Sequence, residues 1–197
     1  MREDEMASWS GLVRGVVLGA GVVVLVSACN SGGESKGSNT NSASATPTIA
    51  ADVPAGFDAC KDLPQSLIQS EELKNKGADN TDRPGGIKWR GCIWVQSDGY
   101  SGTIDTTTIT LAMVHANSQF TVTEDLNVGG RAALTYRPSD DQTDQHEHCI
   151  LIVEMRGGSL EVSIDNPRSR RKSGNQHSCE IAKRLATQII PAIPDTL

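Results

Sequence analysis

The chain has 197 residues, of which 37 % are hydrophobic and 4 % are aromatic. This length suits one domain of ordinary size plus some additional sequence, and the low apolar content excludes a protein that crosses a membrane many times. The 24 acidic residues outnumber the 18 basic ones and give a net charge of −6. Because no basic field extends over the chain, a nucleic-acid partner is excluded as well.

An uncharged apolar segment occupies residues 15–28 near the N-terminus. It is too short to span a bilayer, which needs about 20 residues, but it fits the hydrophobic core of a signal peptide preceded by Arg14. The sequence Glu3-Asp4-Glu5 is unfavourable in front of such a core. We therefore expect residues 1–28 to hold a signal peptide and translation to start at Met6.

The apolar segment ends in Leu25-Val26-Ser27-Ala28-Cys29, which resembles the bacterial lipobox. Small residues before the cysteine suit peptidase cleavage, and the Cys29 thiol would carry the lipid. Two or three acyl chains such as palmitate, at about 0.8 kcal/mol per buried methylene, hold a protein firmly on a bilayer. The motif predicts lipid anchoring to the extracytoplasmic face of the cell membrane. The alternative is a secretory signal with a chance cysteine.

The next segment, residues 29–53, begins with Cys29 and is rich in Ser, Thr, Gly and Asn. Such a composition cannot bury enough apolar surface to offset the entropy of ordering, so it predicts a flexible tether. Residues 54–197 then form a single globular domain, which is long enough to build one core.

Four elements are predicted in the first part of this domain. Residues 63–76 show helical spacing of apolar side chains and are followed by Gly77. Residues 87–96 alternate, with bulky side chains on both faces, and indicate a central strand. Alternation also predicts strands at residues 107–115 and, after two glycines, at residues 131–136.

The second part of the domain gives the clearest pattern. Two alternating segments, residues 149–155 and 159–165, flank a Gly-Gly pair and predict a β-hairpin whose second arm, with Glu161, is wet on one side. A final helix is expected from an N-cap at Ser178 to Pro191. The predicted fold class is α+β, with an antiparallel sheet of four to five strands and N- and C-terminal helices packed on one face.

Besides Cys29, the chain has four cysteines, an even number that favours two disulfides in an exported domain. Four thiols allow three pairings, and loop-closure entropy does not choose among them. Each consecutive pair would join the start of a predicted helix to a nearby strand, so we favour Cys60 with Cys92 and Cys149 with Cys179. A zinc site is the alternative, but no Cys-x-x-Cys spacing supports it.

Several short sequences resemble a known family. They are Phe57-Asp58-Ala59-Cys60, Gly91-Cys92-Ile93-Trp94, Cys149 and Cys179-Glu180-Ile181-Ala182. With the lipobox, they resemble the actinobacterial lipoproteins grouped as domain of unknown function 3558, over about residues 55–193. The family's Asp-Pro-Cys appears here as Asp58-Ala59-Cys60. The resemblance implies a membrane-anchored envelope domain with two disulfides, and it implies no known activity.

Candidate metal ligands gather before the predicted hairpin. His146 and His148 would share one face of an extended strand, and the neighbouring acidic residues are Asp140, Asp141, Asp144 and Glu147. Two histidines do not make a zinc site, and the acidic residues lack the spacing of a calcium loop. We therefore predict no metal or other cofactor, with His146 and His148 as weak candidates in a solvated loop.

A basic segment precedes the last helix and contains Arg168, Arg170, Arg171 and Lys172. It is a candidate contact for anionic lipid headgroups or an acidic polymer of the envelope, and the alternative is an exposed polar loop. Its Ser-x-x-Lys sequence also occurs in penicillin-recognising enzymes, but their other two motifs are missing from the chain.

No combination of nucleophile, base and orienting group emerges from the sequence. His115 is a candidate base or a satisfied strand-end histidine, and Trp89 and Trp94 are interpreted as core residues. The acidic residues Asp62, Glu71 and Glu72 are interpreted as surface charges of the first helix.

Three functions remain. We favour a non-enzymatic, lipid-anchored module that binds an envelope protein, glycan or lipid. A carrier of an apolar ligand and an uncharacterised enzyme are the alternatives.

Overall fold

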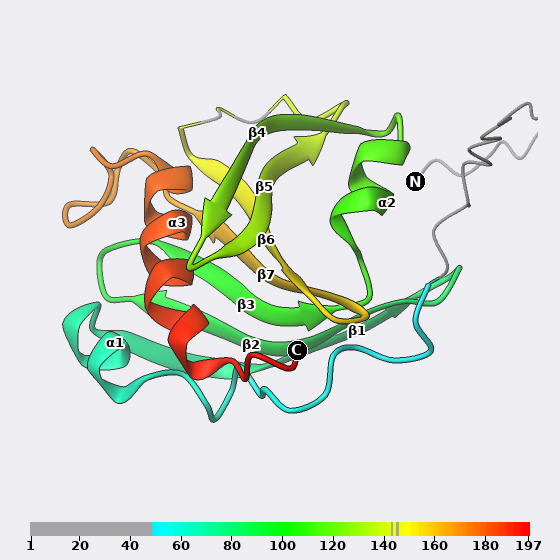
Figure 1. Ribbon diagram of the computed structural model, residues 1–197. Helices are drawn as coiled ribbons and strands as arrows, with labels where there is room; N and C mark the ends of the chain where they lie inside the picture. The colour runs from blue at the N-terminus through cyan, green and yellow to red at the C-terminus, as the bar shows by residue number, and fades with distance from the viewer. Residues whose placement is uncertain (1–48, 143, 145) are drawn as a thin grey trace, which may run out of the picture. The chain divides into compact units, whose positions relative to one another are not determined.

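The computed structural model describes residues 49–142, 144 and 146–197. Seven strands form one antiparallel sheet in the order β1-β2-β3-β7-β6-β5-β4 (Figure 1). The strands are β1 (Leu73–Arg83), β2 (Ile87–Gln96), β3 (Ser101–Thr107), β4 (Phe120–Val128), β5 (Arg131–Pro138), β6 (His148–Met155) and β7 (Gly158–Asp165). The helical elements are α1 (Gln65–Ser70), α2 (Leu111–Ala116), α3 (Ser178–Ile189) and the 3₁₀ turn η1 (Ile190–Ala192).

The predicted fold class is therefore wrong. The described chain is mostly a seven-stranded antiparallel sheet with three short helices, not an α+β domain with four to five strands and two terminal helices on one face. The helix α1 is only 6 residues long. The helix α2, which was not predicted, lies on a different side of strands β5–β7 from α3 (Figure 1).

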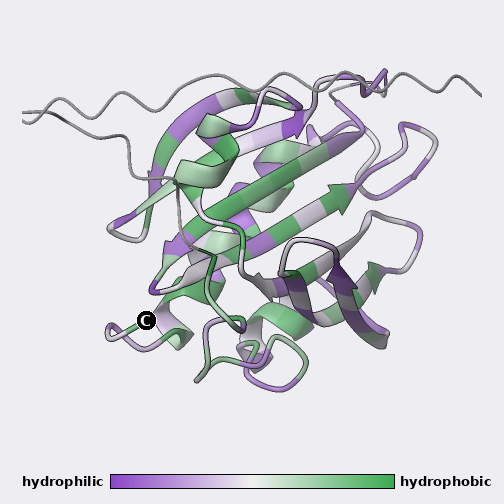
Figure 2. Cartoon of the chain, turned by 90° about the vertical axis from the view of Figure 1, so that its right-hand side faces the viewer, coloured by the Kyte–Doolittle hydropathy of each residue, from purple (hydrophilic) through white to green (hydrophobic). Residues whose placement is uncertain are grey.

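The first face of the sheet is covered by the larger core cluster. Alternate residues of the strands point into it, among them Ile104, Leu151 and Val162, and they pack against apolar side chains of α3 such as Ile181 and Leu185. Bands of apolar and polar residues alternate along the strands in Figure 2, as expected when successive side chains point to opposite faces.

The second face of the sheet is only partly covered. A smaller cluster, with Leu134, Tyr136 and Ile152 from the strands, packs against Ile109 and against Val114 of α2. This cluster lies over the β5–β6 side of the sheet. Towards β1, β2 and β3 the same face carries polar side chains and forms the pocket described below.

Two predicted elements are wrong. The helix predicted for residues 63–76 ends at Ser70, and Glu72, with a φ of 54°, takes the left-handed conformation that begins the turn into β1. Gly77 lies at a bulge in β1 instead of at a helix end. The strand predicted for residues 107–115 is also wrong, because the Thr110 side chain caps a helix by accepting a hydrogen bond from the Met113 N–H at 3.2 Å.

The two edge strands, β1 and β4, were not predicted as strands. Most of their residues are exposed and polar, as is common on edges that must not pair with other chains. Strand β3 was missed too. Strand β2 agrees with its predicted range, but it lies next to the edge strand β1 and is not central.

The second part of the domain agrees with its predictions. Strand β5 and the β6–β7 hairpin form where expected, and Gly157 in the turn has a φ of 83°. The final helix α3 also forms, although its N-cap is His177, which accepts a hydrogen bond from the Cys179 N–H at 3.2 Å, and not Ser178.

Candidate binding pocket on the second face of the sheet

The uncovered part of the second face holds a polar pocket of 170 Å³. Its lining comes from four strands and comprises Asp79, Thr81, Arg83, Trp89, Thr103, Asp105 and Glu161. We call it the carboxylate pocket. It differs from an ordinary wet sheet face because two of its acidic side chains are buried.

The strand register places the acidic residues in one row. Asp79 of β1 pairs with Gly91 of β2, Gly91 pairs with Asp105 of β3, and Asp105 pairs with Glu161 of β7. Directly opposed residues of neighbouring strands project from the same face of the sheet. The topology thus brings together three carboxylates that are far apart in the sequence.

Gly91 provides the space in which the Asp105 carboxylate lies. A Cβ atom at this position would lie 2.2 Å from Asp105 Oδ1 and 2.1 Å from the Ile104 carbonyl oxygen. Such distances are far below van der Waals contact, so any side chain at position 91 would displace Asp105 or the β3 backbone. The glycine of the Gly91-Cys92-Ile93-Trp94 sequence therefore has a structural role in the pocket.

Asp105 is the most deeply buried acid of the pocket. The residue is 1 % exposed, and its Oδ1 atom has no hydrogen-bond partner within the described part of the chain. Burial raises the pKa of Asp105 to about 8; a hydrogen bond from Thr103 opposes this shift, and the charges of Asp79 and Glu161 add to it. A buried acceptor without a partner is uncommon in folded proteins and requires an explanation.

Glu161 lies beside Asp105 and is 7 % exposed. Burial raises its pKa to about 7, although hydrogen bonds from Trp89 and Tyr136 favour the charged form. The Tyr136 hydroxyl lies 3.4 Å from Glu161 Oε2, and burial raises the pKa of this tyrosine as well. The prediction that the face of β7 with Glu161 is wet is wrong at this residue.

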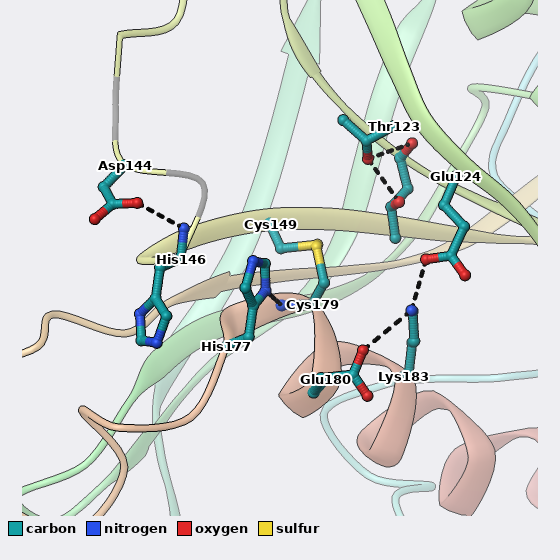
Figure 3. The surroundings of a disulfide bond; sticks show 10 residues. Thr123, Glu124, Asp144, His146, Cys149, His177, Cys179, Glu180 and Lys183 are labelled. Atoms are coloured by element: carbon teal, nitrogen blue, oxygen red, sulfur yellow. Dashed lines mark hydrogen bonds and ion pairs between the residues drawn. A yellow bond between two sulfur atoms is a disulfide. The ribbon is translucent and has the colours of Figure 1, made fainter.

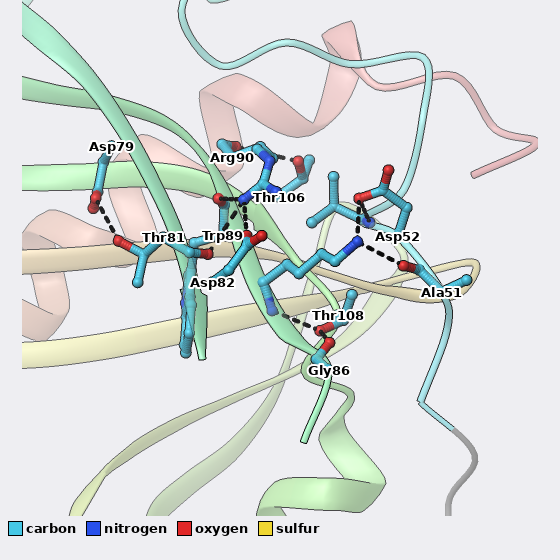
Figure 4. Close-up of polar contacts among 12 residues, drawn as sticks. Ala51, Asp52, Asp79, Thr81, Asp82, Gly86, Trp89, Arg90, Thr106 and Thr108 are labelled. Atoms are coloured by element: carbon cyan, nitrogen blue, oxygen red, sulfur yellow. Dashed lines mark hydrogen bonds and ion pairs between the residues drawn. The ribbon is translucent and has the colours of Figure 1, made fainter. Parts of the chain in front are cut away.

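The rim of the pocket is polar and more exposed. Thr81 donates a hydrogen bond to Asp79 at 3.3 Å, and the Arg83 guanidinium lies 6.0 Å from the centre of the Trp89 ring. Figure 4 shows Asp79, Thr81 and Trp89 on these strands; the ion pair of Arg90 with Asp82 that it also shows comes from the alternating positions, which project from the other face. Trp89 packs on the edge of the smaller core cluster and also lines the pocket, so its interpretation as a core residue is incomplete.

A second buried acid, on the first face of the sheet, has a different environment. Glu71 is bound by Arg184 of α3, with nitrogen–oxygen distances of 2.8 and 3.2 Å, and by the Tyr100 hydroxyl at 2.9 Å. Burial acts to raise the pKa of Glu71, but the hydrogen bonds from Arg184 and Tyr100 outweigh it and lower the pKa. The interpretation of Glu71 as a surface charge is wrong.

The four predicted cysteines form the two predicted disulfides, Cys60–Cys92 and Cys149–Cys179. Both pairings are confirmed. The first joins the segment before α1 to β2, and the second joins β6 to the start of α3 (Figure 3). They clamp the helices to the covered side of the sheet.

The weak metal candidates do not assemble a site. His148 Nδ1 lies 2.9 Å from Asp165 Oδ1, and His146 lies against the ring of His177 with their centres 5.4 Å apart. Figure 3 shows His146 and His177 near the Cys149–Cys179 disulfide. Across the residues that the structure describes, no group of three or more His, Cys, Asp or Glu side chains is placed to hold a metal ion.

The basic segment carries less unpaired charge than its sequence suggests. Arg168 pairs with Asp144 at 3.0 Å, Arg171 pairs with Asp98, and Lys172 pairs with Glu72 at 2.5 Å. No ion pair of Arg170 is found among the described residues. Contact of this segment with an anionic surface stays a prediction.

His115, the candidate base, lies in the last turn of α2 and pairs with Asp125, with Nε2 3.1 Å from Oδ1. It does not line the carboxylate pocket. Cys29, the predicted lipidation site, lies outside the described residues. In the described part of the chain no helix has the length and apolarity needed to cross a membrane.

Sequence reasoning missed the carboxylate pocket. Glu161 lies between two apolar neighbours, which is the pattern of any strand with one wet face, and Asp105 lies in a mostly polar segment with Ile104 before it and Thr106 after it. The one available signal was Gly91 inside a strand, because an interior glycine often marks a close approach of another group. That signal does not say which group approaches.

Fold and pocket together define an extensively hydrogen-bonded β-sheet protein, clamped by two disulfides, with an open acidic site. The chain matches the family described as "Protein of unknown function (DUF3558)" over residues 24–192, and it belongs to this family. Comparison with curated proteins and with solved structures gives no match. Membership of the family of unknown function that the sequence resembles is confirmed, whereas the lipobox and the actinobacterial origin stay predictions. Family membership assigns no activity.

Proposed function

We propose that the protein is a lipid-anchored binding module of the cell envelope, tethered through Cys29 and acting without catalysis. The observation that carries the binding role is the carboxylate pocket, on an open part of the sheet, where a buried acceptor of Asp105 lacks a partner within the residues that the structure describes. Binding sites are places where a protein keeps polar groups unpaired for a ligand.

The proposed location rests on two further features. The lipobox-like sequence ending in Cys29 supports lipid attachment after export. The disulfides Cys60–Cys92 and Cys149–Cys179 support an oxidising compartment, because such bonds seldom persist in the cytosol. The tether of residues 29–53 would then hold the domain away from the bilayer surface.

The anchoring is tested by detergent-phase partitioning of the full chain expressed in a bacterium that processes lipoproteins. The wild type is expected in the detergent phase and the membrane fraction, whereas Cys29→Ala is expected in the aqueous phase or as an uncleaved precursor. Ser31→Ala, in the tether, is the control and should partition as the wild type does. Equal partitioning of Cys29→Ala and wild type would contradict the proposal.

The side of the membrane is tested on intact cells. Protease added outside the cell, after removal of the wall, should digest the wild-type domain while a cytoplasmic marker protein stays intact. Protection of the domain until the cells are lysed would place it in the cytoplasm and contradict the proposal.

A further inference from the structure

We propose that the carboxylate pocket binds the protonated amine at the end of an organic cation. This inference rests on the proposed binding function and names the chemical class of the ligand. Three acidic residues in a row would not by themselves indicate a ligand. The additional observation is Asp105, which is 1 % exposed, lines the pocket and has an Oδ1 atom without a partner in the described chain.

The charge of the carboxylate pocket favours a cationic ligand. None of the ion pairs formed by the described residues involves Asp79, Asp105 or Glu161. Buried carboxylates are normally compensated by a cation, as Glu71 is by Arg184. Among the described residues, no ion pair gives the acids of the carboxylate pocket such a partner, so a cation from outside would supply the missing charge and the missing hydrogen-bond donors.

The Trp89 ring in the lining of the pocket also favours a cationic ligand. A cation is attracted to the face of a tryptophan ring within about 6 Å of its centre. The Arg83 guanidinium already lies 6.0 Å from the centre of the Trp89 ring, which shows that a cationic group can approach this wall. Arg83 is an exposed residue of the pocket lining, and none of the ion pairs among the described residues joins it to Asp79, Asp105 or Glu161.

The size of the carboxylate pocket limits how much of a ligand it can hold. Pockets for whole drug-sized molecules have volumes of roughly 300–1,000 Å³. The carboxylate pocket, at 170 Å³, holds only the end of a ligand. A primary ammonium on an alkyl chain fits this description, since it has three donors for the carboxylates and apolar methylenes for Trp89.

An inorganic cation fits less well. Over the described residues, no three acidic or imidazole groups are close enough together to hold one metal ion. A hydrated ion would also gain little from the indole ring, which favours organic cations. The metals therefore serve as comparison ligands in the test.

Binding of a cation should be linked to proton release. Burial favours the protonated forms of Asp105 and Glu161, and an ammonium beside them favours the ionised forms. The other titratable or charged groups that face them are Asp79 and Arg83 of β1, Tyr136 of β5 and His148 of β6. Amine affinity is therefore expected to rise between about pH 6 and pH 8.

The test is calorimetric titration of the full chain, purified in a non-ionic detergent, with two amines. Cadaverine represents a free amine, and Nα-acetyl-lysine amide represents a lysine side chain of a partner protein. Nα-acetyl-norleucine amide, which lacks the charge, is the neutral comparison. Tighter binding of cadaverine supports the proposal with a free amine as source, and tighter binding of the lysine derivative supports it with a protein as source.

The variants Asp105→Asn and Glu161→Gln should each weaken amine binding at least ten-fold. The control Asp125→Asn, which removes an exposed carboxylate from the same sheet, should bind as the wild type does. Two pocket variants are used because one of them could fail to fold, which circular dichroism would show.

Three results with the amines would overturn the proposal. They are no binding of either amine at millimolar concentration and pH 8, equal binding of the neutral comparison, and amine binding that folded Asp105→Asn and Glu161→Gln retain in full. Binding of Ca²⁺ or Mg²⁺ alone, lost in the same variants while amines do not bind, would also overturn it in favour of a metal site. None of these results bears on detergent-phase partitioning, so failure of the amine proposal and failure of the anchoring proposal are distinguishable.

Discussion

Buried carboxylates have opposite environments on the two faces of the sheet. On the covered face Glu71 is 9 % exposed and receives hydrogen bonds from Arg184 and Tyr100. On the second face Asp105 is 1 % exposed and its Oδ1 atom has no partner within the described chain. The pKa of Glu71 is lowered and the pKa of Asp105 is raised, to about 8.

This difference separates an acid that stabilises the fold from one that destabilises it. A buried charge with a bidentate partner and a further donor recovers much of its lost hydration, whereas an unpaired one does not. Proteins keep such unpaired acids mainly at functional sites. If this contrast is correct, substitutions on the two faces should change the stability of the protein in different ways.

The largest expected effect is on the covered face, from loss of a disulfide. Replacing both cysteines of Cys60–Cys92 or of Cys149–Cys179 by serine releases a loop with a sequence separation of 32 or 30 residues. Loop-closure entropy gives a loss of about 4 kcal/mol in the free energy of unfolding for each bridge. Urea denaturation measures it, and a loss below about 1 kcal/mol would mean that the bridges do not clamp this face.

A smaller loss is expected for Gly91→Ala. The added Cβ would overlap Asp105 Oδ1 and the Ile104 carbonyl oxygen, so the β2–β3 pairing must shift, at about 1–3 kcal/mol. Thermal unfolding is the measurement. A variant as stable as the wild type would show that Asp105 does not lie over Gly91.

Glu71→Gln should lower the free energy of unfolding by about 2 kcal/mol, because the Arg184 charge loses its ionic partner. The value is set below that of a fully buried pair, since the Arg184 side chain is 39 % exposed. The control is Glu72→Gln, whose exposed ion pair with Lys172 should contribute less than about 0.5 kcal/mol. Equal losses in the free energy of unfolding for the two substitutions would contradict the claim that the pair of Glu71 with Arg184 stabilises the fold more than an exposed ion pair does.

On the second face, Asp105→Asn should change how the free energy of unfolding depends on pH. The folded wild type keeps a proton on Asp105 that the unfolded chain releases near the ordinary pKa of 3.8, so its free energy of unfolding falls as pH rises from about 4 to about 8. The asparagine variant lacks this contribution. Between pH 5 and pH 8 its loss of stability should be smaller than that of the wild type by more than about 1.4 kcal/mol, which corresponds to one pKa unit. Parallel pH profiles would contradict this prediction.

The parts of the fold that were predictable are those with strong local signals. The β6–β7 hairpin has alternating apolar residues around Gly157-Gly158, and α3 has an apolar stripe with Pro191 beyond it. The pairing of Cys149 with Cys179 followed from the positions of these elements, and the pairing of Cys60 with Cys92 followed from the first predicted helix and the strand after it. Edge strands β1 and β4 gave no such signal, because their exposed polar side chains also suit a helix or a loop.

The carboxylate pocket was not predictable for a different reason. Asp79, Asp105 and Glu161 meet only through the order β1-β2-β3-β7, in which β7 inserts beside β3. Burial of Asp105 depends on its neighbours across the sheet and on the absent side chain of Gly91, none of which can be deduced from the strand itself. Glu71 was misinterpreted likewise, because its partner Arg184 is far away in the sequence.

The most direct test of the contrast between the two faces is an NMR titration of the side-chain carboxyl carbons of the full chain in detergent. We predict that Asp105 titrates near pH 8, that Glu161 titrates near pH 7, and that Glu71 titrates below its ordinary value of 4.5. Titration of Asp105 and Glu161 near pH 4, like exposed acids, would contradict the claim that the second face holds buried carboxylates without an ionic partner among the described residues.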